Sequence, residues 1–281
     1  TPRDMDATPY LLVQLSDPHI THPGRLISGR VDTAAALQHA VERVLQIRPR
    51  PVTVLVTGDL VDRGHPDEYA QLRERLQPLI DASLPLALLP GNHDAREPLK
   101  QAFAGMPGVH CGGTGTPAIQ YALDLPGPLR LVVLDSLVPG QPHGGFDDAR
   151  LAQAEALLAE RPAIPTIVAL HHPPHTTGLA VMDAMALQHG LDGFEALIAR
   201  HPQVQRIVCG HLHRMTLGRV AHAPVVSAPS TAHQLALELA PNAPLALALE
   251  TPGWLIHAWG PGLPLVTHLA QAGSPQTLAD L

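Results

Sequence analysis

The sequence predicts an α/β domain, and three observations support this prediction. Short apolar runs rich in β-forming residues alternate with segments of helical spacing. Most of the runs end at Gly, Asp, Asn or His, as strands in such domains do. The 281 residues are 45% hydrophobic, and the 30 prolines and 23 glycines are scattered, so no linker or repeat divides the chain. We therefore expect a single domain spanning residues 1–281.

The elements follow from these patterns in order along the chain. The apolar runs predict strands at residues 11–15, 52–56, 86–89, 119–123, 131–134, 167–170, 206–209, 225–227, 245–249, 254–259 and 265–268. Helical spacing predicts helices at residues 33–47, 66–80 and 149–158. In the first helix, Ala36, Ala40, Val44 and Ile47 recur at intervals of four, four and three. Residues 173–193 are the least regular long stretch, so we expect a functional loop there that covers the site.

The C-terminal part of the chain differs from the rest. Turn signals separate its last three predicted strands, and no helical segment intervenes. We expect a motif-bearing core over residues 10–231 and a β-rich part over residues 232–281. Trp254 and His257 stand in an alternating apolar segment, which is more typical of a half-buried strand than of a cofactor or partner surface.

Charge and composition exclude several classes of protein. The formal net charge of −7 provides no basic field for long nucleic acid. The two cysteines, Cys111 and Cys209, form no CxxC pair, and we expect both to be small buried apolar residues. The apolar run at residues 10–15 is too short for a membrane span and lacks a signal-peptide layout. We expect a cytoplasmic protein without a membrane span, and the sequence leaves a homo-oligomer, such as a dimer, open.

Polar residues follow three of the early strands. They are Asp17 and His19 after the first, Gly58 and Asp59 after the second, and Asn92, His93 and Asp94 after the third. Asp17 and His19 are two residues apart, so in an extended segment their side chains point to the same side. Asp59 stands at the carboxyl end of its strand, which is the usual place of ligand sites in open α/β sheets.

Two later apolar runs end in histidines: His171 and His172 after one, His211 and His213 after the other. Taken singly, each group is explained as well by turn chemistry or by a core histidine. Together, five strand ends carry Asp, Asn or His, which independent turn preferences do not explain. The joint pattern predicts a metal centre at the carboxyl ends of the strands.

At these motifs the sequence resembles the calcineurin-like metallophosphoesterases. The matching motifs, in the family's order, are D-x-H at Asp17 and His19, G-D at Gly58 and Asp59, G-N-H-D at residues 91–94, H at His171 and G-H-x-H at residues 210–213. The ALHHPP, CGHLHR and SAPST stretches are most similar to bacterial class III cyclic-nucleotide phosphodiesterases and related glycerophosphodiesterases. The resemblance implies a two-sheet sandwich flanked by helices, a four-layer αββα arrangement.

The resemblance also implies two sets of metal ligands. One ion is expected at Asp17, His19, Asp59 and His213, and the other at Asp59, Asn92, His171 and His211. Asp59 belongs to both sets, as suits a carboxylate between two cations. Imidazole and oxygen ligands without thiolate are compatible with iron, manganese, zinc or cobalt. The resemblance favours iron with manganese or zinc.

The family pattern assigns His93 to the phosphate rather than to a metal. We expect His93 to bind the phosphate or to protonate the leaving oxygen, with Asp94 orienting its ring. Asn92 and His213 are counted with His93 among the substrate-binding residues. His172 is left open between a supporting role and a neighbour of two prolines, and Asp62 is expected to cap the next helix. No role is assigned to the other histidines, including His22, His39, His143, His189, His222 and His268.

The function expected from these residues is hydrolysis of a small phosphodiester by hydroxide generated at two metals. A cyclic nucleotide, cyclic AMP or cyclic GMP, is the leading substrate, and a glycerophosphodiester is the next. Two alternatives stay open: a phosphomonoesterase on the same scaffold, and a non-catalytic binding scaffold, against which the intact ligand set argues.

Overall fold

The computed structural model describes residues 8–111 and 117–273. Its helices are α1 (Thr33–Gln46), α2 (Pro66–Asp81), α3 (Arg96–Phe103), α4 (Asp148–Ala159), α5 (Ala180–Asp183) and α6 (Leu191–Arg200). Its strands are β1 (Tyr10–Leu15), β2 (Thr53–Thr57), β3 (Leu86–Leu89), β4 (Val109–His110), β5 (Tyr121–Leu125), β6 (Leu129–Val133), β7 (Gly144–Gly145), β8 (Thr166–Ala169), β9 (Leu187–His189), β10 (Val204–Cys209), β11 (Leu217–Val220), β12 (Ala223–Ser227), β13 (Gln234–Leu235), β14 (Leu247–Ala248), β15 (Gly253–Gly260) and β16 (Leu263–Gln271).

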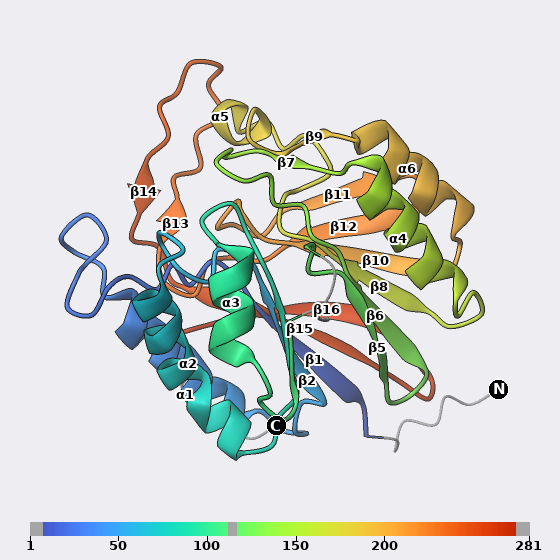
Figure 1. Ribbon diagram of the computed structural model, residues 1–281, viewed down its shortest axis with the longest axis horizontal. Coiled ribbons are helices and arrows are strands. Elements are labelled where there is room, and N and C mark those ends of the chain that lie inside the picture. The colour runs from blue at the N-terminus through green and yellow to red at the C-terminus, as the bar shows by residue number, and fades with distance from the viewer. Residues whose placement is uncertain (1–7, 112–116, 274–281) are drawn as a thin grey trace, which may run out of the picture.

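Two six-stranded sheets form the centre of the molecule. The first has the order β16-β15-β1-β2-β3-β4 and the second the order β11-β12-β10-β8-β6-β5. In the first sheet β1 to β4 are parallel, and β15 and β16 add an antiparallel pair beside β1. In the second sheet β6, β8, β10 and β12 are parallel, with antiparallel β5 and β11 at the edges. Figure 1 shows α1 to α3 outside the first sheet and α4 and α6 outside the second.

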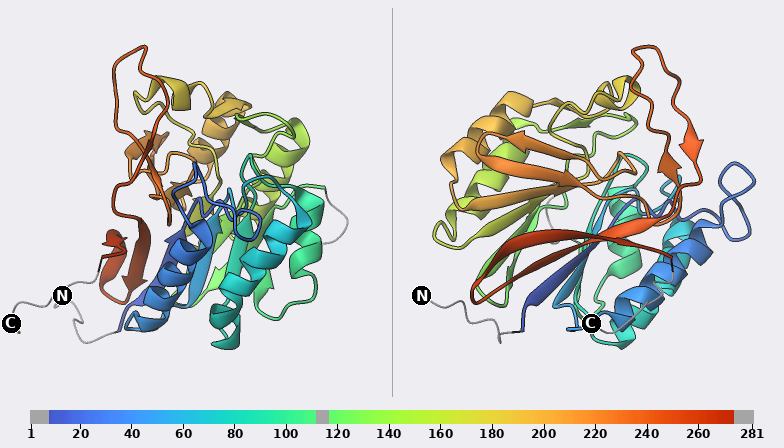
Figure 2. Two further views of the ribbon diagram at one scale, coloured as in Figure 1. Left: turned by 90° about the vertical axis from the view of Figure 1, so that its left-hand side faces the viewer. Right: turned by 180° about the vertical axis from the view of Figure 1, so that it is seen from behind.

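The sheets pack face to face through an apolar layer. Leu12 and Leu55 of the first sheet and Ile167 and Val208 of the second are fully buried in it. Separate apolar clusters join the first sheet to α1 to α3, and the second to α4 and α6. The two-sheet sandwich flanked by helices is therefore confirmed, and the views from the side and from behind show the same layers (Figure 2).

Local sequence explains why the first helix forms where it does. The Asp32 side chain accepts a hydrogen bond from the backbone N–H of Ala35 at 2.9 Å, as a helix N-cap does. Leu37, Val41 and Val44 of α1 face the core. The buried side of the helix therefore only partly matches the predicted series of Ala36, Ala40, Val44 and Ile47. Cys111 and Cys209 are both buried, as predicted.

Some predicted elements were wrong or missed. The strand expected at residues 245–249 reduces to the two residues of β14, and the leucines around it are exposed. Helices α3 and α6 were missed because they are short and bury only two or three residues each. The stretch 173–193 contains one helical turn, α5, and the short strand β9. Among the described residues, no helix is long and apolar enough to cross a membrane.

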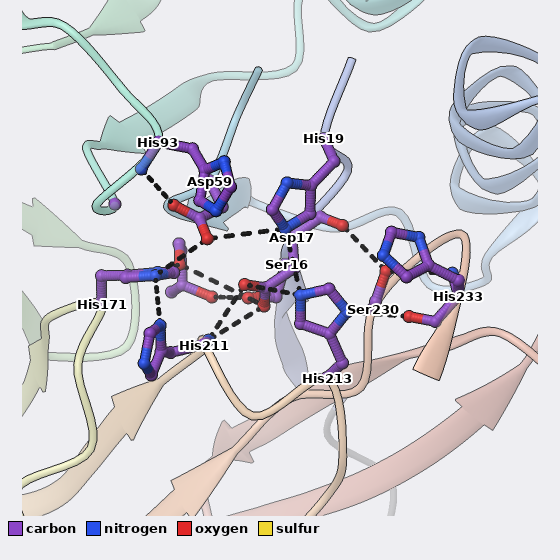
Figure 3. A network of polar contacts seen from close by, with 12 residues as sticks. Ser16, Asp17, His19, Asp59, His93, His171, His211, His213, Ser230 and His233 are labelled. Atoms are coloured by element: carbon purple, nitrogen blue, oxygen red, sulfur yellow. Dashed lines mark hydrogen bonds and ion pairs between the residues drawn. The ribbon is translucent and has the colours of Figure 1, made fainter. Parts of the chain in front are cut away.

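The topology brings the predicted motifs to one place. Strands β1, β2 and β3 of the first sheet, and β8 and β10 of the second, run so that the segments after their carboxyl ends meet at the same edge of the sandwich (Figure 3). The segments that carry Asp17, Asp59, Asn92, His171 and His211 all leave these ends. The site therefore lies where the two sheets meet rather than on one of them.

Candidate metal centre

The backbone at the site has an uncommon conformation. Asp17, His19, Asp59, His211 and His213 all have positive φ angles, of 49°, 44°, 46°, 68° and 49°. Positive φ is rare for residues other than glycine and costs on the order of 1–3 kcal/mol each. Five of the seven predicted ligands have this conformation, which indicates that the fold sustains backbone strain where these side chains turn toward one point.

Glycines in the motifs allow the loops to approach each other. A Cβ on Gly58, whose φ is +83°, would lie closer than 3.0 Å to the ring of His171. A Cβ on Gly210 would lie closer than 3.0 Å to Ser16 Oγ and to a carboxylate oxygen of Asp17. A Cβ atom essentially never approaches a non-bonded atom this closely, so a side chain at either position would push a predicted ligand out of place.

The first predicted ligand set converges as expected. His19 Nε2 lies 3.0 Å from His213 Nε2 and 3.5 Å from Asp59 Oδ2. His213 Nε2 lies 3.6 Å from Asp17 Oδ1. Four donor atoms from β1, β2 and β10 thus face one another around a common point.

The second set converges beside it. His171 Nε2 lies 3.2 Å from Asn92 Oδ1, 3.2 Å from His211 Nδ1 and 3.4 Å from Asp59 Oδ2. Asp59 Oδ2 is therefore the atom common to both sets, while Asp59 Oδ1 accepts the backbone N–H of His93 at 2.9 Å. Figure 3 shows Asp59 between His19 on one side and His171 on the other.

Carbonyl groups fix the tautomers of two of these rings. His213 Nδ1 lies 2.9 Å from the carbonyl of His233, and His171 Nδ1 lies 2.8 Å from that of Thr57. A carbonyl oxygen only accepts, so each Nδ1 carries a hydrogen and each Nε2 faces the site. A metal-binding histidine is usually held by such a hydrogen bond on its other nitrogen.

The donor set fits two transition-metal ions. Metal–ligand bonds of about 2.0–2.2 Å place neighbouring donor atoms roughly 3–3.6 Å apart, as observed for both sets. Burial lowers the pKa of both His211 and His213 to about 3, so these rings are neutral and offer lone pairs at ordinary pH. Metal binding by the seven residues stays a prediction that this geometry supports.

Burial and neighbouring charges shift the pKa values of the ligands in opposite directions. Burial raises the pKa of Asp17 to about 7, against the opposing effect of the His171 charge. Burial is the largest single effect on His171 and lowers its pKa, but the charges of Asp59 and Asp17 and the hydrogen bonds to Asp59 and to the Thr57 carbonyl together outweigh burial and raise that pKa to about 9. The proton on His171 Nε2 faces the oxygens of Asp59 and Asn92, and so occupies the position that a cation would take.

A line of hydrogen bonds reaches the site through the layer between the two sheets, starting from Arg206 of β10. It passes through Arg206, Thr267, His257, Gln14, Thr57, Ser16 and Asp17. Gln14 uses both amide hydrogens, on Thr57 Oγ1 at 3.0 Å and on the carbonyl of Cys209 at 2.9 Å. Its oxygen therefore accepts from His257 Nε2 at 3.0 Å. Every group can donate in the same direction, toward Asp17, whose carboxylate accepts from Ser16 Oγ at 2.5 Å.

Two roles predicted from the sequence were wrong. Asp94 does not orient His93, because its carboxylate accepts from the backbone N–H groups of Leu60 and Gly91 and from the hydroxyl of Tyr69. Asp94 therefore holds the two ligand loops together and is not placed to act on the substrate. The ring of His93 is oriented by Asp62 instead, whose carbonyl oxygen accepts from His93 Nδ1 at 2.7 Å.

The second error concerns Asp62 itself, which does not cap α2. The residue at the N-cap of α2 is His65, three residues later, and Glu68 completes its capping box. The carboxylate of Asp62 instead pairs with Arg25 and Arg63 at 3.7 and 3.6 Å.

His172 resolves as a buried supporting residue. Its Nδ1 lies 2.8 Å from Ser136 Oγ, and its ring packs against those of His171 and His211 at 4.9 and 4.8 Å. His172 Nε2 is buried without a hydrogen-bond partner. The ring of His172 thus packs behind the two histidines of the second ligand set.

Two residues of the site escaped the sequence analysis. His233 packs against His19 and His213, with ring centroids 5.5 and 4.8 Å away, and its carbonyl fixes His213. Ser230 Oγ donates to the carbonyl of Asp17 at 2.8 Å. Both follow β12, a sixth strand end, and the SAPST stretch just before His233 was the only signal that could have pointed to them.

Comparison with known proteins agrees with this geometry. Residues 10–215 match the family described as calcineurin-like phosphoesterase. The chain belongs to this family. Such phosphoesterases use a dimetal centre, and this member has His and Asp groups that could hold the ions.

Named relatives of this phosphoesterase include enzymes from two bacteria. It is 35% identical over 227 residues to the glycerophosphodiester phosphodiesterase GpdQ of Enterobacter lignolyticus, covering 80% of this chain and 78% of the relative. It is 33% identical, over the same shares of both chains, to the 3′,5′-cyclic adenosine monophosphate phosphodiesterase CpdA of Pseudomonas aeruginosa. The prediction of a metal-dependent phosphodiester hydrolase is confirmed.

A solved structure supports the fold. A dimetal phosphatase from Danio rerio superimposes with a TM-score of 0.62 at 16% identity, covering 95% of this chain and 100% of that one. At this identity the likeness concerns the fold alone.

We predict that this phosphoesterase binds two ions per chain, because two complete ligand sets share Asp59. Metal analysis after saturation with manganese should find two ions, and Asp59→Ala should weaken both sites. Asn92→Ala should weaken mainly one. Asp62→Ala is the matched control, since it removes a carboxylate near His93 that belongs to neither set, and it should retain two ions. Saturation of the unaltered protein at one ion would contradict the assignment.

We further predict that metal uptake releases protons and strengthens as pH rises from 7 to 9. His171, with its pKa raised to about 9, must lose a proton before Nε2 can bind a cation. Calorimetric titration with manganese in buffers of different ionisation enthalpy measures the protons released. No release at pH 7.5 would contradict this view of His171.

The same pKa has a consequence for the metal-free protein. Because the folded pKa of His171 lies above its ordinary value of 6.5, its contribution to stability is fully present below pH 6.5. This contribution is lost as pH rises toward 9, and the midpoint of thermal unfolding should fall accordingly. His171→Asn should show a flatter profile over the same range.

Proposed function

We propose that this protein hydrolyses a small phosphodiester, with a 3′,5′-cyclic nucleotide, cyclic AMP or cyclic GMP, as its leading substrate. The observation that carries the proposal is the composition of the cavity over the site. It has a volume of about 300 Å³ and is lined on one side by His19, Asp59, Asn92, His93 and other polar residues of the site. No lysine or arginine is among its described lining residues.

This composition favours a diester over a monoester. A phosphomonoester carries a charge of about −1.5 to −2 near pH 7, whereas a diester carries a single negative charge. Without arginine or lysine to pair with the second charge, the site is better matched to the diester. A cavity of this volume is at the small end for ligand sites, which also disfavours long nucleic acid.

The relatives support two diester classes. One bears the name of a cyclic AMP phosphodiesterase, and the other that of a glycerophosphodiester phosphodiesterase. A glycerophosphodiester is therefore the second candidate. A non-catalytic scaffold is disfavoured because both predicted ligand sets are intact.

In this proposal, different residues of the site hold the metals, donate a proton and contact the substrate. Two ions held by the ligand sets would bind phosphate oxygens and lower the pKa of a water molecule, supplying hydroxide for in-line attack. We favour iron with manganese or zinc, and cobalt is chemically compatible. His93, whose Nδ1 donates to Asp62, directs Nε2 away from that carbonyl, and the nearby Asp59 charge raises its pKa. A raised pKa suits His93 to give a proton to the leaving oxygen. Asn92 and His213 remain proposed contacts to the substrate.

The cellular setting forms part of the proposal. We propose a cytoplasmic enzyme that acts on a small substrate, alone or as a homo-oligomer.

We predict that catalytic efficiency on a small phosphodiester exceeds that on the matching monoester. The panel consists of cyclic AMP, cyclic GMP, glycerophosphoethanolamine, AMP and glycerol 3-phosphate with the manganese-loaded protein. Substantial turnover of monoesters without any turnover of diesters would select the phosphomonoesterase alternative.

We predict that His93→Ala slows the hydrolysis of cyclic AMP far more than that of bis(4-nitrophenyl) phosphate. Nitrophenolate leaves without a proton near neutral pH, whereas a ribose alkoxide does not, and general acid catalysis contributes about 10²–10⁴-fold. Metal content should be unchanged. Equal losses on both substrates would assign His93 to phosphate binding, and loss of an ion would make it a ligand.

A further inference from the structure

An apolar ribbon leaves the sandwich next to the site. Residues 235–250 begin at the last residue of β13, turn back and return through β14, and in Figure 1 this segment projects beyond the sheets beside α5. Leucine occupies every second position on both arms: 235, 237 and 239, then 245, 247 and 249. Leu235 pairs with Leu247 across the ribbon, so these two leucines lie on the same face.

Part of this face forms one wall of the cavity that holds the catalytic residues. Leu235, Leu245 and Leu247 line that cavity together with Met182 and Met185. Leu235 and Met182 are buried, whereas Leu245 and Leu247 keep 48% and 46% of their surface exposed. Leu237, Leu239 and Leu249 are also exposed but do not line the cavity. The leucines at 235, 245 and 247 therefore line the catalytic cavity, and those at 237, 239 and 249 face solvent.

The position of the wall is tied to the metal ligands. Leu212, between His211 and His213, is fully buried in one cluster with Met182 and Leu235. Arg214, directly after His213, donates to the carbonyl of Leu235 at 2.5 Å and to the carboxylate of Glu250 at 2.8 Å. One side chain thus holds both ends of the ribbon, and the same turn carries two predicted ligands.

The two sides of the cavity differ in chemistry. Imidazoles and carboxylates form the side that takes the phosphate, while Met182, Met185, Leu235, Leu245 and Leu247 offer no hydrogen bond from their side chains. A glycerol or choline group on this wall would give up hydrogen bonds or hydration without replacement. A flat aromatic ring would instead cover Leu245 and Leu247 and remove apolar surface from water.

We propose that the wall formed by Met182, Met185, Leu235, Leu245 and Leu247 is a recognition site for an aromatic substituent of the diester, of the size of a nucleobase. This inference rests on the proposed function and deepens it, because it separates cyclic nucleotides from glycerophosphodiesters. The ribbon is then the element that determines specificity, and the metal ligands determine the reaction.

The test is a pair of double variants on the same ribbon. Leu245→Ser with Leu247→Ser alters the wall, and Leu237→Ser with Leu239→Ser changes two exposed leucines of the same ribbon that do not line the cavity. Catalytic efficiency is measured on cyclic AMP and on glycerophosphoethanolamine, with manganese content and thermal midpoint as checks on folding. Because two apolar side chains no longer cover the aromatic ring, the ratio of the two efficiencies should fall about tenfold in the wall variant, through KM for cyclic AMP. The ratio should stay within about twofold in the control.

Two outcomes would overturn the proposal: an equal loss on both substrates in the wall variant, or an equal change of the ratio in the control. Failure of the proposed function is distinguishable from either. If the unaltered protein does not hydrolyse cyclic AMP, that substrate is wrong, and bis(4-nitrophenyl) phosphate takes its place as the aromatic substrate. A tenfold fall in its efficiency relative to glycerophosphoethanolamine in the wall variant would still support the wall, and an unchanged ratio would overturn it.

Discussion

The structure depends on the burial of one carboxylate, that of Asp59, between the two sheets. One of its oxygens faces His19 of the first sheet's β1 segment and His171 of the second sheet's β8 segment. Withdrawing a carboxylate from water costs several kcal/mol unless positive charge or hydrogen bonds compensate. In the metal-free protein the proton of His171 supplies part of this compensation, and the neutral rings of His211 and His213 supply none. The arrangement is suited to cations, which would satisfy all of these donor atoms together.

The strained backbone at the ligands follows from the same constraint. Two sheets joined by an apolar layer can bring strand ends close together, but regular extended strands would alternate the directions of their side chains. Positive φ angles at Asp17, Asp59 and His211 turn side chains toward the junction. Asp94 and Asp17 then fasten neighbouring loops by accepting backbone N–H groups, from Leu60 and Gly91 and from His211. The loops are thus held before any substrate arrives.

The sequence was informative where chemistry and position coincided. Asp17, Asp59 and His171 directly follow apolar strands, so their convergence could be predicted from the rule that parallel strands end at one edge. The role of Asp94 could not be predicted in this way, because two of its partners, Leu60 and Tyr69, lie 34 and 25 residues away and nothing in the motif indicates these contacts. His233 was missed since it lies six residues past β12, beyond any strand periodicity. The alternating leucines at residues 245–249 satisfied the strand pattern, yet among the described residues only the two residues of β13 pair with this segment.

The line of hydrogen bonds from Arg206 to Asp17 also determines how two strands of the first sheet align. Gln14 and His257 are polar residues on the inner, otherwise apolar face, where Leu12 pairs with His257 and Gln14 with Leu255. If β15 shifted by two residues along β1, the same face would stay inward, but Leu255 or Trp259 would take the place of His257. The oxygen of Gln14 would then be left without a donor in a dry layer, a cost of about 1–3 kcal/mol. Gln14 and His257 therefore specify how β15, which comes from the C-terminal part of the chain, aligns with β1. Apolar packing alone would not distinguish this register from one shifted by two residues.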